Sequence, residues 1–129
     1  MGYRSHNISL LAMSDNLTIL HNPRCSKSRQ TLQLIEEQGE EAHVLKYLET
    51  SPTADELRSI LKKLGMPAQQ IIRKGETIYK QEYKGKDLTE EEWIQAMVTH
   101  PILIERPIVV KGDKAVLGRP PENVKLLFS

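Results

Sequence analysis

The stretch that decides the fold is LTILHNPRCSKSRQTLQLI, residues 17–35. Its first four residues, Leu17–Leu20, are apolar and include β-formers, which predicts a buried strand. The dipeptide Asn22-Pro23 predicts a turn directly after this strand. A helical pattern of apolar residues begins just after Cys25, the only cysteine in the sequence. Cys25 is therefore predicted to lie at the N-terminus of a helix.

This position favours a reactive thiolate at Cys25. The unpaired N–H groups and the macrodipole of a helix N-terminus stabilise a negative charge. Nearby side chains with positive or potentially positive charge are His21, Arg24, Lys27 and Arg29. A cysteine nucleophile that attacks an anion needs this combination. The competing interpretation makes Cys25 a small buried hydrophobe with solvated charges around it. The density of polar and basic residues favours the nucleophile.

The residues around Cys25 also suggest how an oxyanion would be held. Backbone N–H groups at a helix N-terminus bind oxyanions, and the Ser28 hydroxyl is a candidate substrate contact. We expect His21 to stabilise the thiolate, either as a cation or through hydrogen bonds. His43 and His100 are isolated, and no residues at metal-ligand spacing surround the cysteine, so we expect no metal.

Composition limits the classes of function. The 129 residues predict one domain with a substantial core. Lys and Arg number 18 against 17 Asp and Glu, and this net charge of +1 gives no bulk electrostatic reason to bind nucleic acid. One cysteine cannot form an intrachain disulfide. A free thiol among charged groups predicts a reducing cytoplasm.

The N-terminal residues differ from the rest of the chain. Their apolar run, Ile8–Met13, is too short to span a membrane. It is not followed by a small-residue cleavage site, which argues against a signal peptide. We expect residues 1–15 to be a disordered extension and residues 16–129 to form a single domain.

The remaining pattern predicts the order of the elements. We expect a helix over 26–38, a strand over 42–48, helices opened by capping boxes at 53–56 and 89–92, short helices over 67–73 and 78–84, a hairpin over 108–111 and 115–117, and a last helix from Pro120 or Pro121 to near Phe128. The first two strands should be parallel with a right-handed crossover. This order is typical of an α/β thioredoxin-like fold with a helical insertion, although the pattern also permits another three-layer α/β arrangement.

Three separated arginines are candidate anion ligands. Arg73, Arg106 and Arg119 are each flanked by apolar residues or prolines. Arginines in such surroundings often point into a structured site, where the planar guanidinium grips a tetrahedral oxyanion. Taken singly, each is better explained as an ordinary surface or ion-pair residue. The Arg106-Pro107 bond is a candidate cis peptide, because a cis-proline before a strand faces the active cysteine in thioredoxin-like folds.

Several motifs together resemble a known family. They are HNPRCSKSR (21–29), LKYLE (45–49), IRK (72–74), HPILIERPIVV (100–110) and GRPP (118–121). The chain resembles the glutaredoxin-coupled arsenate reductases of the ArsC type. The resemblance implies a thioredoxin-like fold with a helical insertion and a mixed four-stranded sheet. It implies that Cys25 is the nucleophile, that His21 helps lower its pKa, and that Arg73, Arg106 and Arg119 bind the anion.

The resemblance also implies an activity. Cys25 would attack arsenate, glutathione would serve as co-substrate, and glutaredoxin would resolve the mixed disulfide, with no tightly bound cofactor and no nucleic-acid or membrane partner. Two alternatives stay open. One is an Spx-like transcription regulator that binds RNA polymerase, although such proteins usually carry a second cysteine where this chain has Ser28. The other is a general glutathione-linked thiol-disulfide oxidoreductase.

Overall fold

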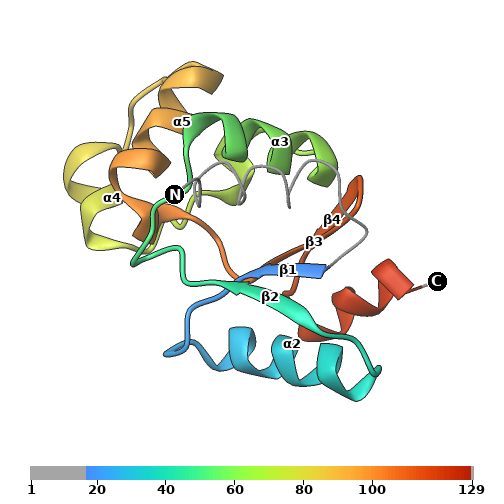
Figure 1. Ribbon diagram of the computed structural model, residues 1–129. Helices are drawn as coiled ribbons and strands as arrows, with labels where there is room; N and C mark the ends of the chain where they lie inside the picture. Colours follow the sequence, from blue (N-terminus) through green and yellow to red (C-terminus); the bar gives the residue numbers. More distant parts are fainter. Residues whose placement is uncertain (1–16, 129) are drawn as a thin grey trace, which may run out of the picture.

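A four-stranded mixed sheet lies between two groups of helices in the computed structural model, which describes residues 17–128 (Figure 1). The elements are β1 (Leu17–Leu20), α2 (Ser26–Glu37), β2 (Ala42–Leu45), α3 (Ala54–Leu64), η1 (Ala68–Ile71), α4 (Thr77–Glu82), α5 (Glu90–Thr99), η2 (Pro101–Leu103), β3 (Ile108–Lys111), β4 (Lys114–Leu117) and η3 (Pro121–Phe128). The elements from α3 to η2 form the helical insertion between β2 and β3. The extension expected at residues 1–15 lies outside the described residues.

The register of the sheet brings four chain segments to one of its ends. The strand order is β2-β1-β3-β4, with β1 parallel to β2 and the other pairs antiparallel. Leu20, the last residue of β1, pairs with both Leu45 and Ile108, and Ile108 pairs with Leu117. The loops after β1, β2 and β4 and the loop before β3 therefore meet at the same end of the sheet.

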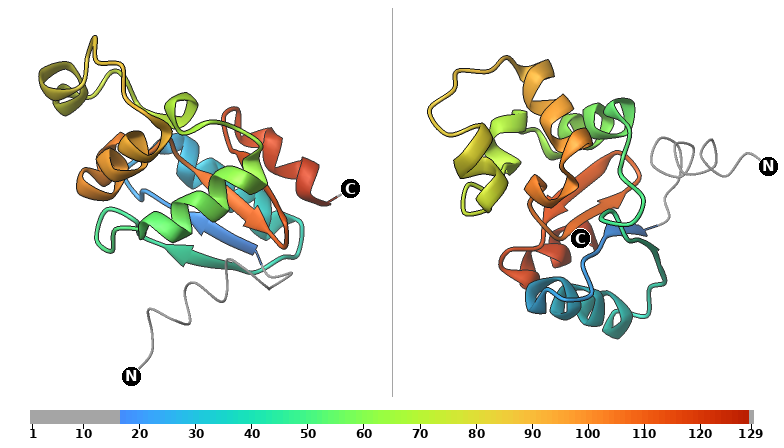
Figure 2. Two further views of the ribbon diagram at one scale, coloured as in Figure 1. Left: turned by 90° about the horizontal axis from the view of Figure 1, so that it is seen from above. Right: turned by 90° about the vertical axis from the view of Figure 1, so that its left-hand side faces the viewer.

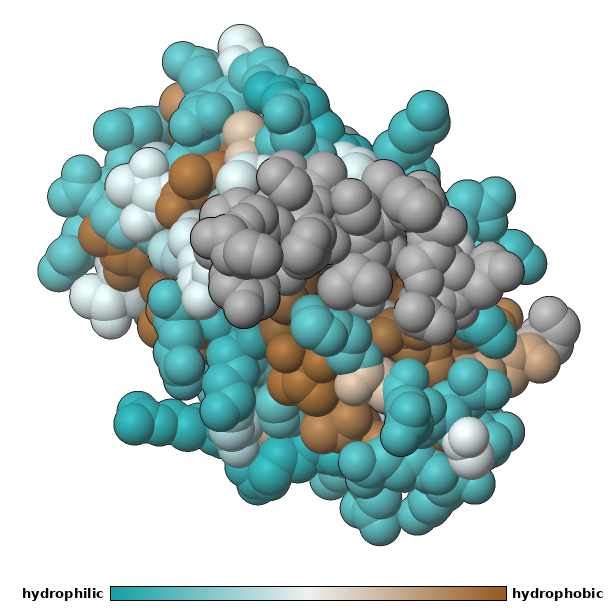
Figure 3. All heavy atoms as spheres, in the orientation of Figure 1, coloured by the Kyte–Doolittle hydropathy of each residue, from teal (hydrophilic) through white to brown (hydrophobic). Residues whose placement is uncertain are grey.

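Both faces of the sheet are covered by helices, as the side and top views show (Figure 2). Successive strand residues point to opposite faces. Leu17 and Ile19 pack with Ile35 of α2 and with η3, whereas Leu20 and Ile108 face the insertion. The outer strand β2 has an intermediate to exposed burial pattern. Hydrophobic atoms reach the surface near β2 in the space-filling view, and Val44 is 37% exposed (Figure 3).

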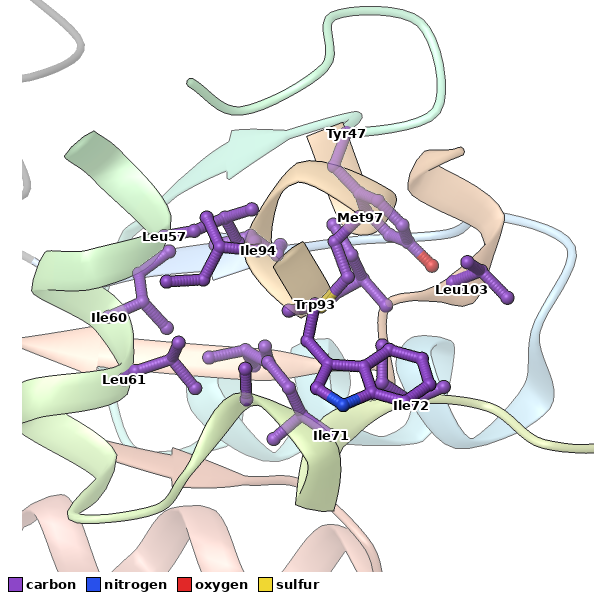
Figure 4. Close-up of a cluster of buried hydrophobic side chains, with 14 of the residues drawn as sticks. Tyr47, Leu57, Ile60, Leu61, Ile71, Ile72, Trp93, Ile94, Met97 and Leu103 are labelled. Carbon is purple, nitrogen blue, oxygen red and sulfur yellow. The ribbon is translucent and has the colours of Figure 1, made fainter. Parts of the chain in front are cut away.

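The larger core lies between the sheet and the insertion (Figure 4). Trp93 and Met97 of α5 are almost fully buried in it, and the ring of Tyr79 stacks on Trp93 with centroids 6.3 Å apart. Both predicted capping boxes are present at the starts of α3 and α5. Gly65 ends α3 in the left-handed conformation, with φ of 69°, which glycine adopts at little cost.

The structure differs from the sequence-based expectation at three elements. The second strand ends at Leu45 rather than at residue 48, because the chain turns after Lys46 and buries Tyr47 in the larger core. The helix expected over 67–73 is a 3₁₀ helix that ends at Ile71, since Ile72 leaves it to bridge to Ile104. The last helix is also 3₁₀. The strand over 17–20, the parallel β1–β2 pair and the hairpin are confirmed.

Gly118 is predicted to be required for close packing at the end of the sheet where the four loops meet. A Cβ atom at this position would lie 2.7 Å from Pro107 Cγ and 2.7 Å from Thr31 Oγ1. We expect Gly118→Ala to lower the free energy of unfolding by about 1–3 kcal/mol, the usual cost of overpacking. Urea denaturation measures the change. The matched control is Gly75→Ala, where an added Cβ meets no atom within 4 Å. Equal stability of the two variants would contradict this explanation.

Candidate active site

Cys25 lies at the N-terminus of α2, as the sequence predicts. It is the N-cap residue, with φ of −95° and ψ of 123°, and its N–H donates to the Asn22 carbonyl at 2.9 Å. The Asn22 side chain accepts from the N–H of Arg24 at 3.0 Å, which fixes the turn. Cys25 is partly exposed, so its sulfur is not sealed in the core. The interpretation as a buried hydrophobe is therefore wrong.

The surroundings of Cys25 favour the thiolate. Burial alone would raise the pKa of the thiol, but hydrogen bonds to the sulfur outweigh this effect. The donors are the backbone N–H of Ser28, the guanidinium of Arg106, which also contributes its charge, and the backbone N–H of Lys27. The net result is a Cys25 pKa below its ordinary value. Two of the three donors are first-turn amides, so the helix N-terminus acts on the sulfur directly.

His21 is placed differently from the expectation of a cation beside the thiolate. The residue is only 6% exposed, and burial followed by the charges of Lys46 and Arg29 lowers its pKa. A neutral imidazole is therefore favoured at neutral pH, so of the two expected roles the structure favours hydrogen bonding over a positive charge. Its Nδ1 atom lies 2.6 Å from Ser28 Oγ. His21 thus contacts the cysteine loop through Ser28.

Ser28 also needs a correction. Its side chain is fully buried, and Oγ accepts from the N–H of Asn22 at 3.1 Å in addition to contacting His21. The hydroxyl is therefore used inside the protein and is not available to a substrate. Ser28 lowers the pKa of the Cys25 thiol through a hydrogen bond from its backbone N–H. Together, His21 and Ser28 hold the cysteine loop against the start of α2.

The segment that carries Arg73 is joined to the segment that carries Arg106. Ile72 forms an antiparallel bridge with Ile104. The N–H of Arg73 donates to the Leu103 carbonyl at 2.8 Å, and the N–H of Glu105 donates to the Ile71 carbonyl at 2.8 Å. These bonds position Arg73 beside the loop before β3, although 32 residues separate it from Glu105 in the chain.

The carboxylates of Glu105 and Glu76 pair with the three arginines and hold them close together. Glu105 Oε1 accepts from Arg73 Nη1 at 2.9 Å and from Arg119 Nη1 at 3.1 Å. Glu76 Oε2 accepts from Arg73 Nε at 3.1 Å and lies 3.8 Å from Arg106 Nη1. Because a hydrogen bond and the charge of Arg106 also lower the pKa of the Cys25 thiol, the arginines and the cysteine belong to one site. The sequence analysis missed both glutamates. Two features of the sequence could have indicated that these glutamates pair with the arginines. Glu105 directly precedes Arg106, and Glu76 follows Arg73 by three residues.

Tyr47 is a second residue that the sequence analysis missed. It is 1% exposed, and its hydroxyl has no hydrogen-bond partner among residues 17–128. Figure 4 shows the ring reaching between Met97 and Leu103. Burial raises the pKa of Tyr47 to about 12, against the opposing charges of Arg106 and Arg73. The hydroxyl therefore stays protonated beside the site.

Two proline bonds adjoin the arginines. The Arg106-Pro107 peptide is cis, as expected, and Arg119-Pro120 is also cis, which the sequence analysis did not anticipate. Across the described range, no group of three His, Cys, Asp or Glu residues is arranged to hold a metal ion. Within the same range, no helix has the length and apolarity required to cross a membrane.

Comparisons with known proteins identify the family. The model of the ArsC family matches residues 20–127. The uncharacterized protein YfgD of Escherichia coli strain K12 is 52% identical over 114 residues, which cover 87% of this chain and 96% of YfgD. An arsenate reductase of Neisseria meningitidis serogroup A is 44% identical over 114 residues, covering 87% of this chain and 97% of that protein. The chain belongs to the ArsC family.

A solved structure agrees with this assignment. The arsenate reductase from Vibrio cholerae superimposes with a TM-score of 0.84 at 47% identity, covering 90% of this chain and 98% of that one. The expected fold, thioredoxin-like with a helical insertion and a mixed four-stranded sheet, is confirmed.

The role of Arg106 at the sulfur can be tested by alkylation. We expect Arg106→Gln to raise the pKa of Cys25 toward its ordinary value, because a charge-assisted hydrogen bond to the thiolate is lost. Alkylation by iodoacetamide near neutral pH should slow by roughly tenfold, the effect of losing about 1–2 kcal/mol of thiolate stabilisation. The rate is followed from pH 4 to about 10, so that the thiolate titration is covered. Arg58→Gln, which changes an arginine paired with Glu91 on the insertion, is the control. An unchanged pH profile in Arg106→Gln would contradict the assignment.

Proposed function

We propose that this protein reduces arsenate to arsenite, with the Cys25 thiolate as nucleophile and with glutathione and glutaredoxin as external reductants. The observation that carries the proposal is the cluster in which Glu76 and Glu105 hold Arg73, Arg106 and Arg119 together at the end of the sheet that carries Cys25. The guanidinium of Arg106 also lowers the pKa of the Cys25 thiol. Relatives at 42–45% identity that are named arsenate reductase support the choice of substrate.

In the first step, the Cys25 thiolate attacks the arsenic atom of bound arsenate. A bond forms between Sγ and arsenic, one arsenic–oxygen bond breaks, and that oxygen leaves as water after accepting a proton. Arsenic stays in its +5 state. The guanidinium groups and the first-turn N–H groups stabilise the negative charge on the remaining oxygens. The site is suited to this task because its donors are already held in place by Glu76 and Glu105.

In the second step, a glutathione thiolate attacks Cys25 Sγ. A disulfide forms between glutathione and Cys25, the sulfur–arsenic bond breaks, and its electron pair stays on arsenic, which leaves as arsenite in the +3 state. A glutaredoxin thiolate then attacks the glutathione sulfur of the mixed disulfide and releases Cys25 as a thiolate. External thiols fit this chain because its sequence contains no second cysteine. A reducing cytoplasm supplies both partners.

The proposal is tested with the purified protein, arsenate, glutathione, glutaredoxin and a coupled assay for glutathione disulfide. We expect arsenate-dependent turnover, complete loss of it in Cys25→Ser, and a fall in kcat/KM of about 10²–10³-fold in Arg73→Ala, because one anion donor is removed. Arg58→Gln should retain turnover, since within residues 17–128 Arg58 pairs with exposed carboxylates of the insertion. Turnover that persists in Cys25→Ser would reject the mechanism.

The same variants separate the two alternative functions. A general thiol-disulfide oxidoreductase would reduce a glutathione mixed disulfide through Cys25 without needing the arginines. Its activity would therefore be insensitive to Arg73→Ala. A regulator of the Spx type would bind the polymerase α subunit and show no arsenate-dependent oxidation of glutathione. Either result would replace the proposed function.

A further inference from the structure

The arginine cluster is paired with carboxylates before any substrate binds. Glu105 Oε1 accepts from two guanidinium groups, those of Arg73 and Arg119, and also lies 3.3 Å from the N–H of Arg106. Glu76 Oε2 contacts Arg73 and Arg106. The side chains of Glu105 and Glu76 are 25% and 23% exposed, so both are partly removed from water where they meet the arginines.

The consequence is that the charges within the arginine cluster itself largely offset one another. The two carboxylates and the Cys25 thiolate offset the three guanidinium charges. His21 adds no charge when its lowered pKa leaves it neutral. Short-range contacts with the carboxylates therefore contribute to which anion the arginines hold.

The carboxylates also have free acceptor capacity. An ionised carboxylate accepts hydrogen bonds and donates none. The hydrogen bonds of Glu105 all use Oε1, and the contacts of Glu76 with the arginines use Oε2. Each carboxylate therefore retains an oxygen without a hydrogen bond among residues 17–128. Both carboxylates lie within 3.8 Å of guanidinium nitrogens, so an oxyanion bound by the same guanidinium groups would lie beside them. Two facing oxygens repel one another unless a proton lies between them.

We propose that Glu105, assisted by Glu76, restricts this site to oxyanions that bring a proton. Phosphate and arsenate carry at least one proton at neutral pH and can donate a hydrogen bond to the free carboxylate oxygen. Sulfate carries none and meets an unpaired negative oxygen, so it is rejected. This inference rests on the proposed function only in taking the arginine cluster as the anion site.

The test uses inorganic phosphate and sulfate as probes and alkylation of Cys25 as the readout. Each anion is titrated at constant ionic strength against the rate at which iodoacetamide modifies the intact protein. We expect phosphate to protect Cys25 at a concentration about tenfold lower than sulfate does, because a partly buried acceptor disfavours an analogue that lacks the donor. In Glu105→Gln the amide can donate to sulfate, and this ratio should fall toward one, mainly through tighter sulfate binding.

Two further variants make the outcome decisive. Glu91→Gln changes an exposed carboxylate that pairs with Arg58, and should leave the ratio unchanged. Glu76→Gln should reduce the ratio in the same direction as Glu105→Gln, and it supplies the test if Glu105→Gln does not fold. The proposal is overturned if wild-type protein binds both anions equally, if neither glutamate variant changes the ratio, or if both lose phosphate and sulfate together, which would mean that the carboxylates only position the arginines.

This result is independent of catalytic turnover. Arsenate reduction with an unchanged phosphate-to-sulfate ratio in the variants would reject the selectivity and retain the enzyme. A ratio that falls in Glu105→Gln, with no arsenate-dependent oxidation of glutathione by wild-type protein, would reject the reductase and retain the selectivity.

Discussion

The antiparallel pairing of β1 with β3 is the constraint on which the site depends. Leu20 ends β1 opposite Ile108, which begins β3, so the loop that leads to Cys25 and the loop that carries Arg106 emerge at the same place. A register shift of one residue would turn the hydrophobic side chains of a strand to the wrong face. The pairing is therefore fixed by burial on both faces of the sheet, and the contact between Arg106 and the sulfur follows from it.

The helical insertion adds what the sheet alone does not provide. It carries Arg73 and Glu76, and the bridge between Ile72 and Ile104 fixes their position relative to the loop before β3. The core beneath this bridge contains Trp93 and Met97, which are almost fully buried. Packing in the insertion is thus coupled to the geometry of the anion-binding groups, because rigid cores transmit displacement rather than absorb it.

The electrostatics of the site are balanced at short range. The guanidinium groups are shared between Glu105, Glu76 and the cysteine sulfur, and the first-turn amides of α2 complete the surroundings of the thiolate. His21 and Ser28 act inside the loop, where a buried imidazole without charge costs less than a buried imidazolium. The reactivity of Cys25 therefore depends on positioned donors more than on the total charge nearby.

Local sequence determined the elements. The apolar run over 17–20, the turn at Asn22-Pro23 and the two capping boxes each act through neighbouring residues, so each was predictable, as was the position of Cys25 at a helix N-terminus. Only the tertiary structure decided which charged groups meet. Glu105 pairs with Arg73 and Arg119, and Glu76 with Arg106, across distant parts of the chain. Tyr47 is buried because its turn faces the insertion. Such pairings depend on strand register and packing between distant segments, and the pattern of residues along one segment carries no record of them.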